Sequence, residues 1–247
     1  MKLLAIGNSF SQDALKYLHR AALAQGEDIE TVNLFIGGCT LEQHAKNLAS
    51  GAEDYDHEIN GEKPDRKISV GEALTEDDWN VVTLQQASGY SGWGDSYEPF
   101  LTELIGAVRH NAKNARILFH ETWAYEKDSD HRHFGRYCMD QQKMFEALRG
   151  CVQNAAREHH LEVIPVGDAV QTARTLARFD PERGGVSICR DGFHLSRSAG
   201  RYLASLVWLK KLTGVSVADN PFVPDDPKEE ADPLLLEAVR AIADYTA

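Results

Sequence analysis

The chain has 247 residues, of which 43% are hydrophobic, and a formal net charge of −12 at pH 7. This length and apolar content are enough for one large domain with a substantial core. The negative charge disfavours contact with a phosphate backbone, so we expect no nucleic-acid partner. No apolar run reaches the length of a membrane span, and the apolar start of the chain is too short for a signal peptide. We therefore expect a soluble, cytoplasmic protein with no membrane partner.

Two acidic stretches account for all of this negative charge. Residues 53–78 contain ten acidic and three basic side chains, and residues 219–237 contain seven acidic side chains and one basic one. The rest of the chain is nearly neutral, which suits an uncharged substrate. We interpret both stretches as solvated surface segments that lie outside any active site.

The predicted elements alternate between strands and helices. In chain order, apolar runs and helical spacing predict a strand over residues 2–7, a helix over 11–25, a strand over 29–36, a helix over 41–49, a strand over 81–84, a helix over 97–111, a strand over 115–120, a helix over 138–159, a strand over 161–165 and a helix over 196–213. This alternation favours βαβ units, and uninterrupted apolar strands fit a sheet that is covered on both faces. We expect a three-layer α/β/α fold around a sheet of five mainly parallel strands.

Three polar segments interrupt the alternation. Residues 50–78 form a polar insertion, in which Asn60-Gly61 predicts a hairpin turn. Residues 121–136 are rich in His, Asp and Arg. Residues 219–233 hold four of the eight prolines and predict an extended surface segment before a last helix that ends near residue 247. None of the three is a linker between two cores, so we expect one domain over residues 1–247.

Polar side chains follow the predicted strands, at the sheet edge where open parallel sheets bind ligands. Ser9 lies on the tight turn between the first strand and the first helix, where its hydroxyl can act as a nucleophile if a base takes its proton. Asp191 and His194 lie three residues apart in a turn-rich loop, so the carboxylate can hold one imidazole nitrogen while the other faces the serine. The order Ser…Asp…His fits a hydrolytic triad. Taken singly, Ser9 could equally cap the helix, and the Asp-x-x-His pair could serve a turn.

Taken together, these segments resemble the SGNH/GDSL hydrolases. Gly7-Asn8-Ser9-Phe10 is similar to the first sequence block of that superfamily, Gly38 to the second, and Asp191-Gly192-Phe193-His194 to the last. The resemblance covers residues 7–194 and implies a flavodoxin-like SGNH hydrolase fold with a triad of Ser9, Asp191 and His194. A closer resemblance, carried by Gly-Asn-Ser-Phe, Leu-Gln-Gln and Thr-Trp-Ala-Tyr segments, is to a poorly characterised SGNH-related branch and implies no substrate.

The chain departs from the superfamily pattern at two places. Asn8 stands where an aspartate is usual, and Gln85-Gln86 stand where the third block usually supplies an asparagine. The resemblance implies an oxyanion hole formed by the N–H groups of Ser9 and Gly38 together with the side-chain amide of Gln86. Gln85 is the alternative donor.

The glutamine is similar to that of SGNH branches that act on sugar esters. Trp123 and Tyr125 follow the fourth predicted strand and could line a sugar-binding cleft or pack their loop onto the core. The implied function is hydrolysis of a small acyl ester, with acetyl as our choice, on a carbohydrate. A non-catalytic carbohydrate-binding protein on the same fold and an acyltransferase that uses the same residues are the alternatives.

A metal site is the remaining hypothesis that the residues raise. The candidate ligands are His120, Asp128, Asp130, His131 and His133. Their charged flanks in a predicted loop favour a solvated surface over a metal site. The four cysteines, at positions 39, 138, 151 and 189, form no Cys-x-x-Cys pair, so we expect free thiols. We expect neither a bound metal nor a cofactor.

Overall fold

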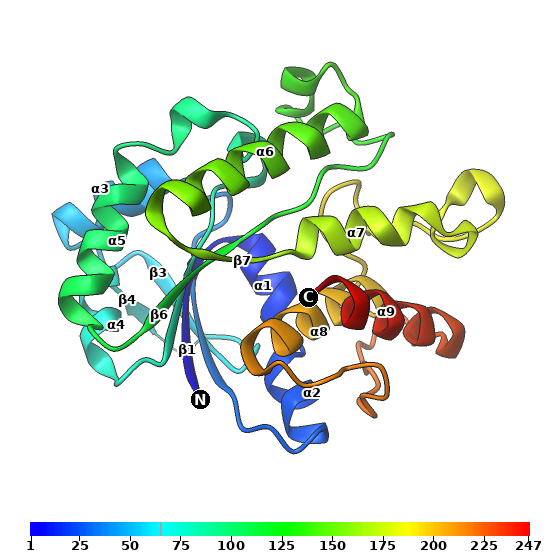
Figure 1. Cartoon of the computed structure of the whole chain (residues 1–247), viewed down its shortest axis with the longest axis horizontal. Helices are drawn as coiled ribbons and strands as arrows, with labels where there is room; N and C mark the ends of the chain where they lie inside the picture. Colours follow the sequence, from blue (N-terminus) through cyan, green and yellow to red (C-terminus); the bar gives the residue numbers. More distant parts are fainter. Residues whose placement is uncertain (65) are drawn as a thin grey trace.

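A computed structural model describes residues 1–64 and 66–247. Within these residues, seven strands form one central sheet in the order β4-β3-β2-β1-β5-β6-β7 (Figure 1). The strands are β1 (Lys2–Gly7), β2 (Glu30–Phe35), β3 (Tyr55–Ile59), β4 (Lys67–Ile68), β5 (Val81–Leu84), β6 (Arg116–His120) and β7 (Glu162–Ile164). The five strands β2, β1, β5, β6 and β7 pair in parallel, which confirms the predicted sheet and gives it the flavodoxin-like order.

The predicted count of five strands is wrong, because the polar insertion adds two more. Strand β3 pairs antiparallel with β2, and β4 pairs antiparallel with β3 at the sheet edge. The predicted turn is present: Asn60 and Gly61 both have positive φ, and the N–H of Glu62 donates to the carbonyl oxygen of Ile59 at 2.9 Å. The sequence of these two strands is mostly polar, as is common near a sheet edge, so a search for apolar runs does not predict them.

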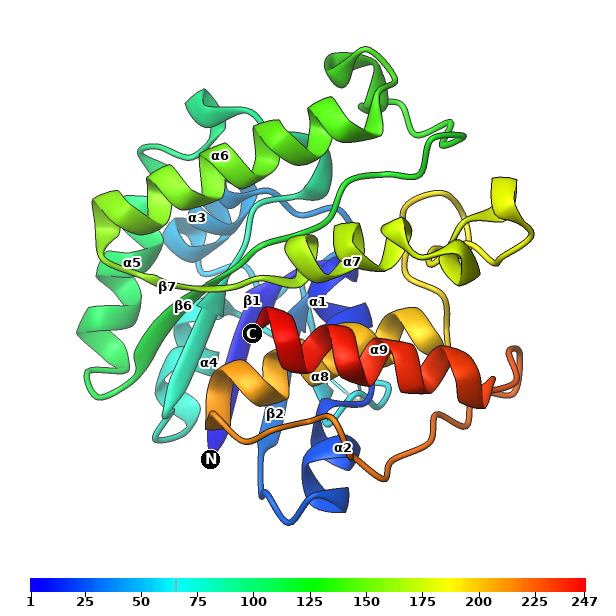
Figure 2. The ribbon, with the colours of Figure 1, turned by 45° about the vertical axis from the view of Figure 1, so that its right-hand side comes forward.

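Helices cover both faces of the sheet. They are α1 (Ser9–Leu15), α2 (Leu18–Ala24), α3 (Leu41–Ser50), α4 (Val70–Glu76), α5 (Phe100–Asn111), α6 (Gln141–His159), α7 (Val166–Thr175), α8 (Ala199–Thr213) and α9 (Pro233–Thr246). Figures 1 and 2 show α1, α2, α7, α8 and α9 gathered on one face, while α3, α4 and α5 cover the other. Helix α6 runs along β7 and supplies residues to both cores. The predicted three-layer fold is therefore confirmed.

The first predicted helix is two helices in the structure. It breaks at Tyr17, whose backbone N–H donates to the hydroxyl of Ser205 on α8 at 3.3 Å. The phenol of Tyr17 donates to the carbonyl oxygen of Arg197 at 2.8 Å. Tertiary contacts with α8 therefore replace the helical continuation that the apolar spacing predicted.

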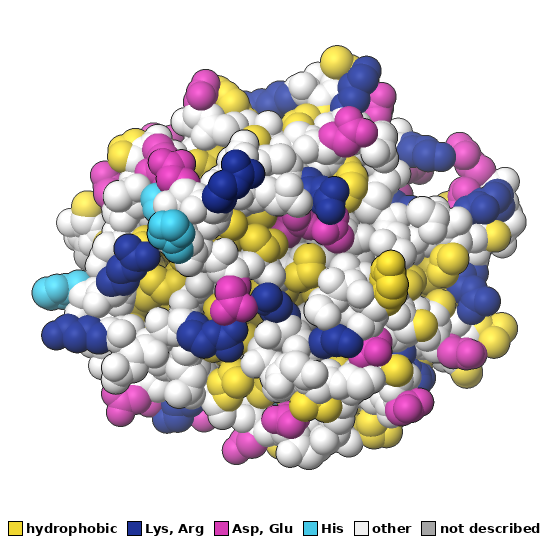
Figure 3. Space-filling model, in the orientation of Figure 1, with side chains coloured by type: hydrophobic (Ala, Val, Ile, Leu, Met, Phe, Trp, Pro, Cys, Tyr) yellow, Lys and Arg dark blue, Asp and Glu magenta, His cyan; other side chains and the backbone are white. Residues whose placement is uncertain are grey.

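The acidic stretches have structural partners as well as solvent. Asp225 pairs with Arg20 at 2.7 Å, and the carboxylate of Glu229 accepts from the backbone N–H groups of Arg197 and Ser198 just before α8. On the face that Figure 3 shows, acidic and basic side chains are interspersed. None of the helices in the described part of the chain is long and apolar enough to span a membrane. All four cysteines are free, as predicted.

A buried carboxylate on α1 fixes the loop that precedes α8. Asp13 lies four residues after Ser9, and its side chain has no exposed surface. Arg190 Nη1 donates to both of its carboxylate oxygens at 3.0 Å, Arg201 Nε donates at 2.7 Å, and the N–H of Leu195 donates at 2.9 Å. This set of contacts, which we call the Asp13 clamp, joins α1 to residues 190–195 and to α8.

Asp13→Asn keeps the shape of the clamp but leaves Arg190 and Arg201 without their shared buried counterion. Removing one partner of a buried ion pair costs about 3–5 kcal/mol, so we expect a loss of this size in the free energy of unfolding, measured by urea denaturation. The matched control is Asp225→Asn at the exposed pair with Arg20, which we expect to cost at most about 1 kcal/mol. Equal losses in the two variants would contradict the clamp.

Glu121 yields a prediction about pH. It follows β6 and its Oε1 accepts from the backbone N–H of Asp168 in the first turn of α7 at 2.9 Å. Burial, and then the carboxylate of Asp168, raise the pKa of Glu121 to about 8. Because the unfolded chain releases this proton near the ordinary carboxyl pKa, the native state loses stability relative to the unfolded state as pH rises from about 5 to about 8.

Glu121→Gln removes this titration and keeps an oxygen that can accept from Asp168. We expect the free energy of unfolding of the variant to exceed that of the unmodified protein increasingly from about pH 5 to about pH 8, with the difference growing by about 1.4 kcal/mol for each pH unit. Denaturation at a series of pH values measures this difference. A difference that stays constant over the range would show that Glu121 does not titrate there.

Candidate active site

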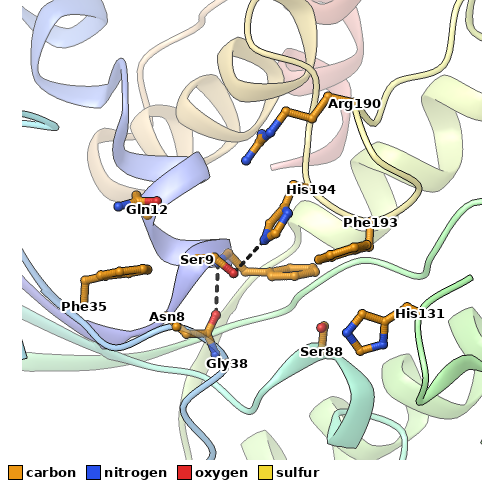
Figure 4. A pocket seen from close by; sticks show the side chains of 12 residues that line it. Asn8, Ser9, Gln12, Phe35, Gly38, Ser88, His131, Arg190, Phe193 and His194 are labelled. Atoms are coloured by element: carbon orange, nitrogen blue, oxygen red, sulfur yellow. Dashed lines mark hydrogen bonds between the residues drawn. The ribbon is translucent and has the colours of Figure 1, made fainter. Parts of the chain in front are cut away.

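A pocket of about 450 Å³ opens at the carboxyl ends of β1, β2 and β5 (Figure 4). Its lining residues are Asn8, Ser9, Phe10, Gln12, Phe35, Gly37, Gly38, Ser88, His131, Arg190, Phe193 and His194. The site therefore lies at the edge of the sheet that the strand pattern predicted. Ser9, Gly38 and His194, three of the predicted site residues, line it together.

Ser9 is the first residue of α1, and its hydroxyl is free of any capping role. The cap is the preceding residue, Asn8, whose Oδ1 accepts from the N–H of Phe10 at 3.0 Å. The Oγ of Ser9 instead lies 2.9 Å from Nε2 of His194, along the dashed line in Figure 4. A serine in this position can donate its proton to an unprotonated imidazole nitrogen.

Asp191 holds the other side of the imidazole. Its Oδ2 lies 2.8 Å from Nδ1 of His194, and its Oδ1 accepts from the backbone N–H of His194 at 2.7 Å. Partial burial alone would raise the pKa of Asp191, but the hydrogen bonds from His194 outweigh it and hold the pKa below its ordinary value. The carboxylate is thus charged at neutral pH, which favours the tautomer with the proton on Nδ1 and leaves Nε2 to accept from Ser9.

Gly38 lies in a tight turn that follows β2. Its φ is +66°, in the left-handed region that favours glycine, and the N–H of Cys39 donates to the carbonyl oxygen of Ile36 at 3.2 Å across the turn. The Nδ2 of Asn8 donates to the carbonyl oxygen of Cys39 at 3.0 Å. Asn8 therefore ties the Gly38 turn to the turn that carries Ser9.

Gln86 does not line the pocket. Its Nε2 donates to the carbonyl oxygen of Ser96 at 2.9 Å, and its Oε1 accepts from the backbone N–H groups of Leu41 and Ala87. Both ends of this amide thus hold the loop that follows β5 against the start of α3. The structure places the predicted oxyanion donor outside the group formed by Ser9, Gly38 and His194.

Gln85, the alternative donor, is also buried outside the pocket. Its Nε2 donates to Oδ1 of Asn8 at 2.7 Å, and its Oε1 lies 2.8 Å from Nδ1 of His120. This side chain connects the turn that carries Ser9 to the end of β6. Its place is behind the nucleophile, where it supports the turn.

Trp123 and Tyr125 have no exposed surface and do not line the pocket. The Nε1 of Trp123 donates to the carbonyl oxygen of Phe193 at 2.7 Å, and its ring stacks on Phe10 at 4.2 Å between centroids. The hydroxyl of Tyr125 lies 2.9 Å from Oγ of Ser88. Trp123 and Tyr125 therefore pack their loop onto the core and do not line a sugar-binding cleft.

Sequence reasoning missed several residues of the pocket wall. Ser88 follows Gln86 by two residues, so its place in the loop after β5 could have drawn attention to it. Arg190 directly precedes the Asp-x-x-His segment. The sequence pattern around His131 indicates only a candidate metal ligand. Among the described residues, no group of His, Cys, Asp or Glu side chains is placed to hold a metal ion.

Comparisons with known proteins identify the family and the fold. Residues 2–241 match the family described as a domain of unknown function, DUF4886. A crystal structure of a DUF4886 family protein from Bacteroides uniformis is 37% identical and superimposes with a TM-score of 0.90, over 99% of this chain and 93% of that one. The chain has no significant match among curated proteins.

More distant structures share the fold. A protein from Slackia heliotrinireducens described as a putative SGNH hydrolase is 20% identical, with a TM-score of 0.57 over 86% of this chain and 98% of that one. An acetylxylan esterase from Geobacillus stearothermophilus is 17% identical, with a TM-score of 0.56 over 86% and 94%. The chain belongs to the DUF4886 family, and its fold is that of the SGNH hydrolases.

Proposed function

We propose that this protein is a serine esterase that hydrolyses a small acyl ester, with acetyl as the acyl group, on a carbohydrate. The observation that carries the proposal is the hydrogen-bonded series from Asp191 through His194 to Ser9, which ends at the wall of an open pocket. A protein that only binds its ligand has no need for a base 2.9 Å from a serine hydroxyl. The acetylxylan esterase among the fold neighbours supports the same chemistry.

In the proposed reaction, His194 takes the proton of Ser9 while Oγ attacks the ester carbonyl. The tetrahedral intermediate collapses, and the protonated His194 gives its proton to the leaving alcohol. A water molecule then attacks the acyl-enzyme with His194 again as the base, which releases the acid and restores Ser9. Asp191 holds the imidazole in place and stabilises its charged form through both steps.

The oxyanion of the intermediate requires donors on the pocket wall. The backbone N–H groups of Ser9 and Gly38 are two, because each belongs to a turn residue that lines the pocket. We assign the third to the hydroxyl of Ser88, since it lines the same pocket while the amide of Gln86 is bound to Ser96. If the buried hydroxyl of Tyr125 donates to Ser88, the proton of Ser88 is left for the oxyanion, and the two bonds strengthen each other.

The residues that line the pocket also indicate which class of substrate it can bind. Phe35 and Phe193 supply apolar surface, whereas Gln12 and Arg190 add hydrogen-bond donors and His131 adds a ring nitrogen. A long alkyl chain is best bound by an apolar wall, while a short acyl group on a polyhydroxylated alcohol matches this mixture. The polar side chains of the lining can hydrogen-bond the hydroxyls of a sugar, which supports a sugar ester as the substrate.

A fluorophosphonate probe tests the nucleophile directly, because it reacts with an activated serine. We expect labelling of the unmodified protein and none of Ser9→Ala, together with a loss of about 10³-fold or more in kcat/KM on 4-nitrophenyl acetate. Ser50→Ala, which removes an exposed serine at the end of α3, is the matched control and should keep full labelling. Labelling that persists in Ser9→Ala at another serine would overturn the assignment.

Ser88→Ala tests the third oxyanion donor. Loss of one such donor typically lowers kcat by about 10²–10³-fold, and we expect this size of effect with little change in KM. Tyr125→Phe should lower kcat by a smaller factor, because it removes only the hydroxyl behind Ser88. An unchanged kcat for Ser88→Ala, combined with a lower kcat for a folded Gln86→Ala variant, would return the role to Gln86.

A further inference from the structure

Two loops at the carboxyl edge of the sheet pack against each other and extend away from the pocket. Residues 88–93 follow β5, and residues 131–137 lie between β6 and α6. The hydroxyl of Tyr137 donates to the carbonyl oxygen of Gly89 at 3.2 Å and accepts from the N–H of Gly92 at 3.1 Å. A side chain at Gly89 would come within 2.3 Å of Nδ1 of His133, so only glycine allows this approach. The two loops therefore form one wall.

A continuous row of rings runs along this wall. It starts at the base of the triad, where the rings of Phe193 and His194 lie 4.2 Å apart between centroids, and Figure 4 shows His131 beside them. The following steps are 4.8 Å from Phe193 to His131, 5.3 Å to His133, 5.0 Å to Tyr90 and 5.7 Å to Trp93. We call these six residues the ring row.

The far end of the ring row is a second, open pocket. Gly92, Trp93, Arg136 and Tyr137 line this pocket of about 360 Å³, and Trp93 is 44% exposed. The guanidinium of Arg136 lies 4.2 Å from the ring centroid of Tyr90 and 4.6 Å from that of Trp93. This contact holds the two rings in place by a cation–π interaction. Arg136 is exposed, and among the described residues none of the ion pairs involves it, so its N–H donors remain open to a ligand.

We infer that the ring row binds a carbohydrate chain whose ester group lies at Ser9, and that Tyr90, Trp93 and Arg136 form its distal subsite. This inference rests on the proposed function, because the row begins at His194. A sugar ring presents C–H groups on its faces and hydroxyls at its rim, which match an aromatic face and a guanidinium respectively. The ring row comprises six rings in five steps of 4.2–5.7 Å, more rings than one sugar can cover, so we take the ligand to be an oligosaccharide or a polymer.

Other occupants fit the wall less well. An acyl chain requires a closed aliphatic surface, whereas the ring row consists of three imidazoles and three other aromatic rings and ends at an exposed tryptophan. A nucleic acid would meet a chain of net charge −12. This half-buried, hydrogen-bonding and ring-lined surface with an exposed end therefore favours a neutral or weakly charged sugar chain.

The test compares short and long ligands on Trp93→Ala. The probes are 4-nitrophenyl acetate and O-acetylated monomers and hexamers prepared from xylan, glucomannan and chitin, so that each carries an acetyl ester. We expect Trp93→Ala and Arg136→Ala to raise KM about tenfold for the hexamer that the unmodified enzyme prefers, with kcat unchanged and with 4-nitrophenyl acetate turned over normally. Trp93→Phe should retain most of the affinity. Tyr245→Ala, which removes an aromatic side chain that is 90% exposed on α9, is the matched control and should change nothing.

A binding measurement separates this inference from the proposed function. Calorimetric titration of Ser9→Ala with the same hexamers reports binding without turnover, and adding Trp93→Ala should weaken it about tenfold. Binding through Trp93 in a protein that hydrolyses no ester would refute the esterase and keep the subsite. Turnover of 4-nitrophenyl acetate with no preference for any hexamer over its monomer, or with hexamer binding unaffected by Trp93→Ala, would overturn the subsite.

Discussion

The hydrogen bond between Ser9 and His194 joins residues that are 185 positions apart, and the site depends on keeping these two segments together. The Asp13 clamp does this, because Asp13 lies on the same helix as Ser9 and binds Arg190 and Leu195 on either side of the Asp191–His194 segment. Helix α1 therefore presents the nucleophile and anchors the loop of its base at once. Buried ion pairs contribute little net stability over apolar packing, so fixing this geometry is the better account of why two arginines meet one buried carboxylate.

A network of uncharged hydrogen-bonding side chains fixes the turn that carries Ser9. The same network explains both departures from the SGNH pattern. The Nδ2 of Asn8 donates to the carbonyl oxygen of Cys39, which a carboxylate at position 8 could not do. Its Oδ1 accepts from Gln85, whose longer side chain also reaches His120. Asn8 and Gln85 are thus partners in one buried hydrogen-bonded chain, and the substitution in the first block and the glutamine in the third block are a single structural feature.

The sequence was enough to predict the parallel sheet and the positions of Ser9, Asp191 and His194, because apolar runs and turn residues report directly on buried strands and their ends. It could not predict which way a polar or aromatic side chain in a loop would point. Gln86 binds Ser96 instead of facing the pocket, and Trp123 is buried against Phe10. Both outcomes depend on tertiary contacts, of Gln86 with Leu41 at the start of α3 and of Trp123 with Phe10, which no local pattern encodes.

The two acidic stretches show that net charge also fails to predict which partners a side chain has. Net charge alone predicts that both stretches are solvated. In the structure, however, Asp226 lies 3.5 Å from Arg201. Arg201 and Arg190, which lines the pocket, both pair with Asp13. Charges of alternating sign thus run from the proline-rich segment to the wall of the active site. Glu58 in the other stretch is buried and accepts from Gln12, which also lines the pocket. Part of the negative charge therefore balances the arginines beside the site, and Glu58 accepts hydrogen bonds from amides there. These acidic groups act on the geometry of the pocket without setting the charge of the substrate.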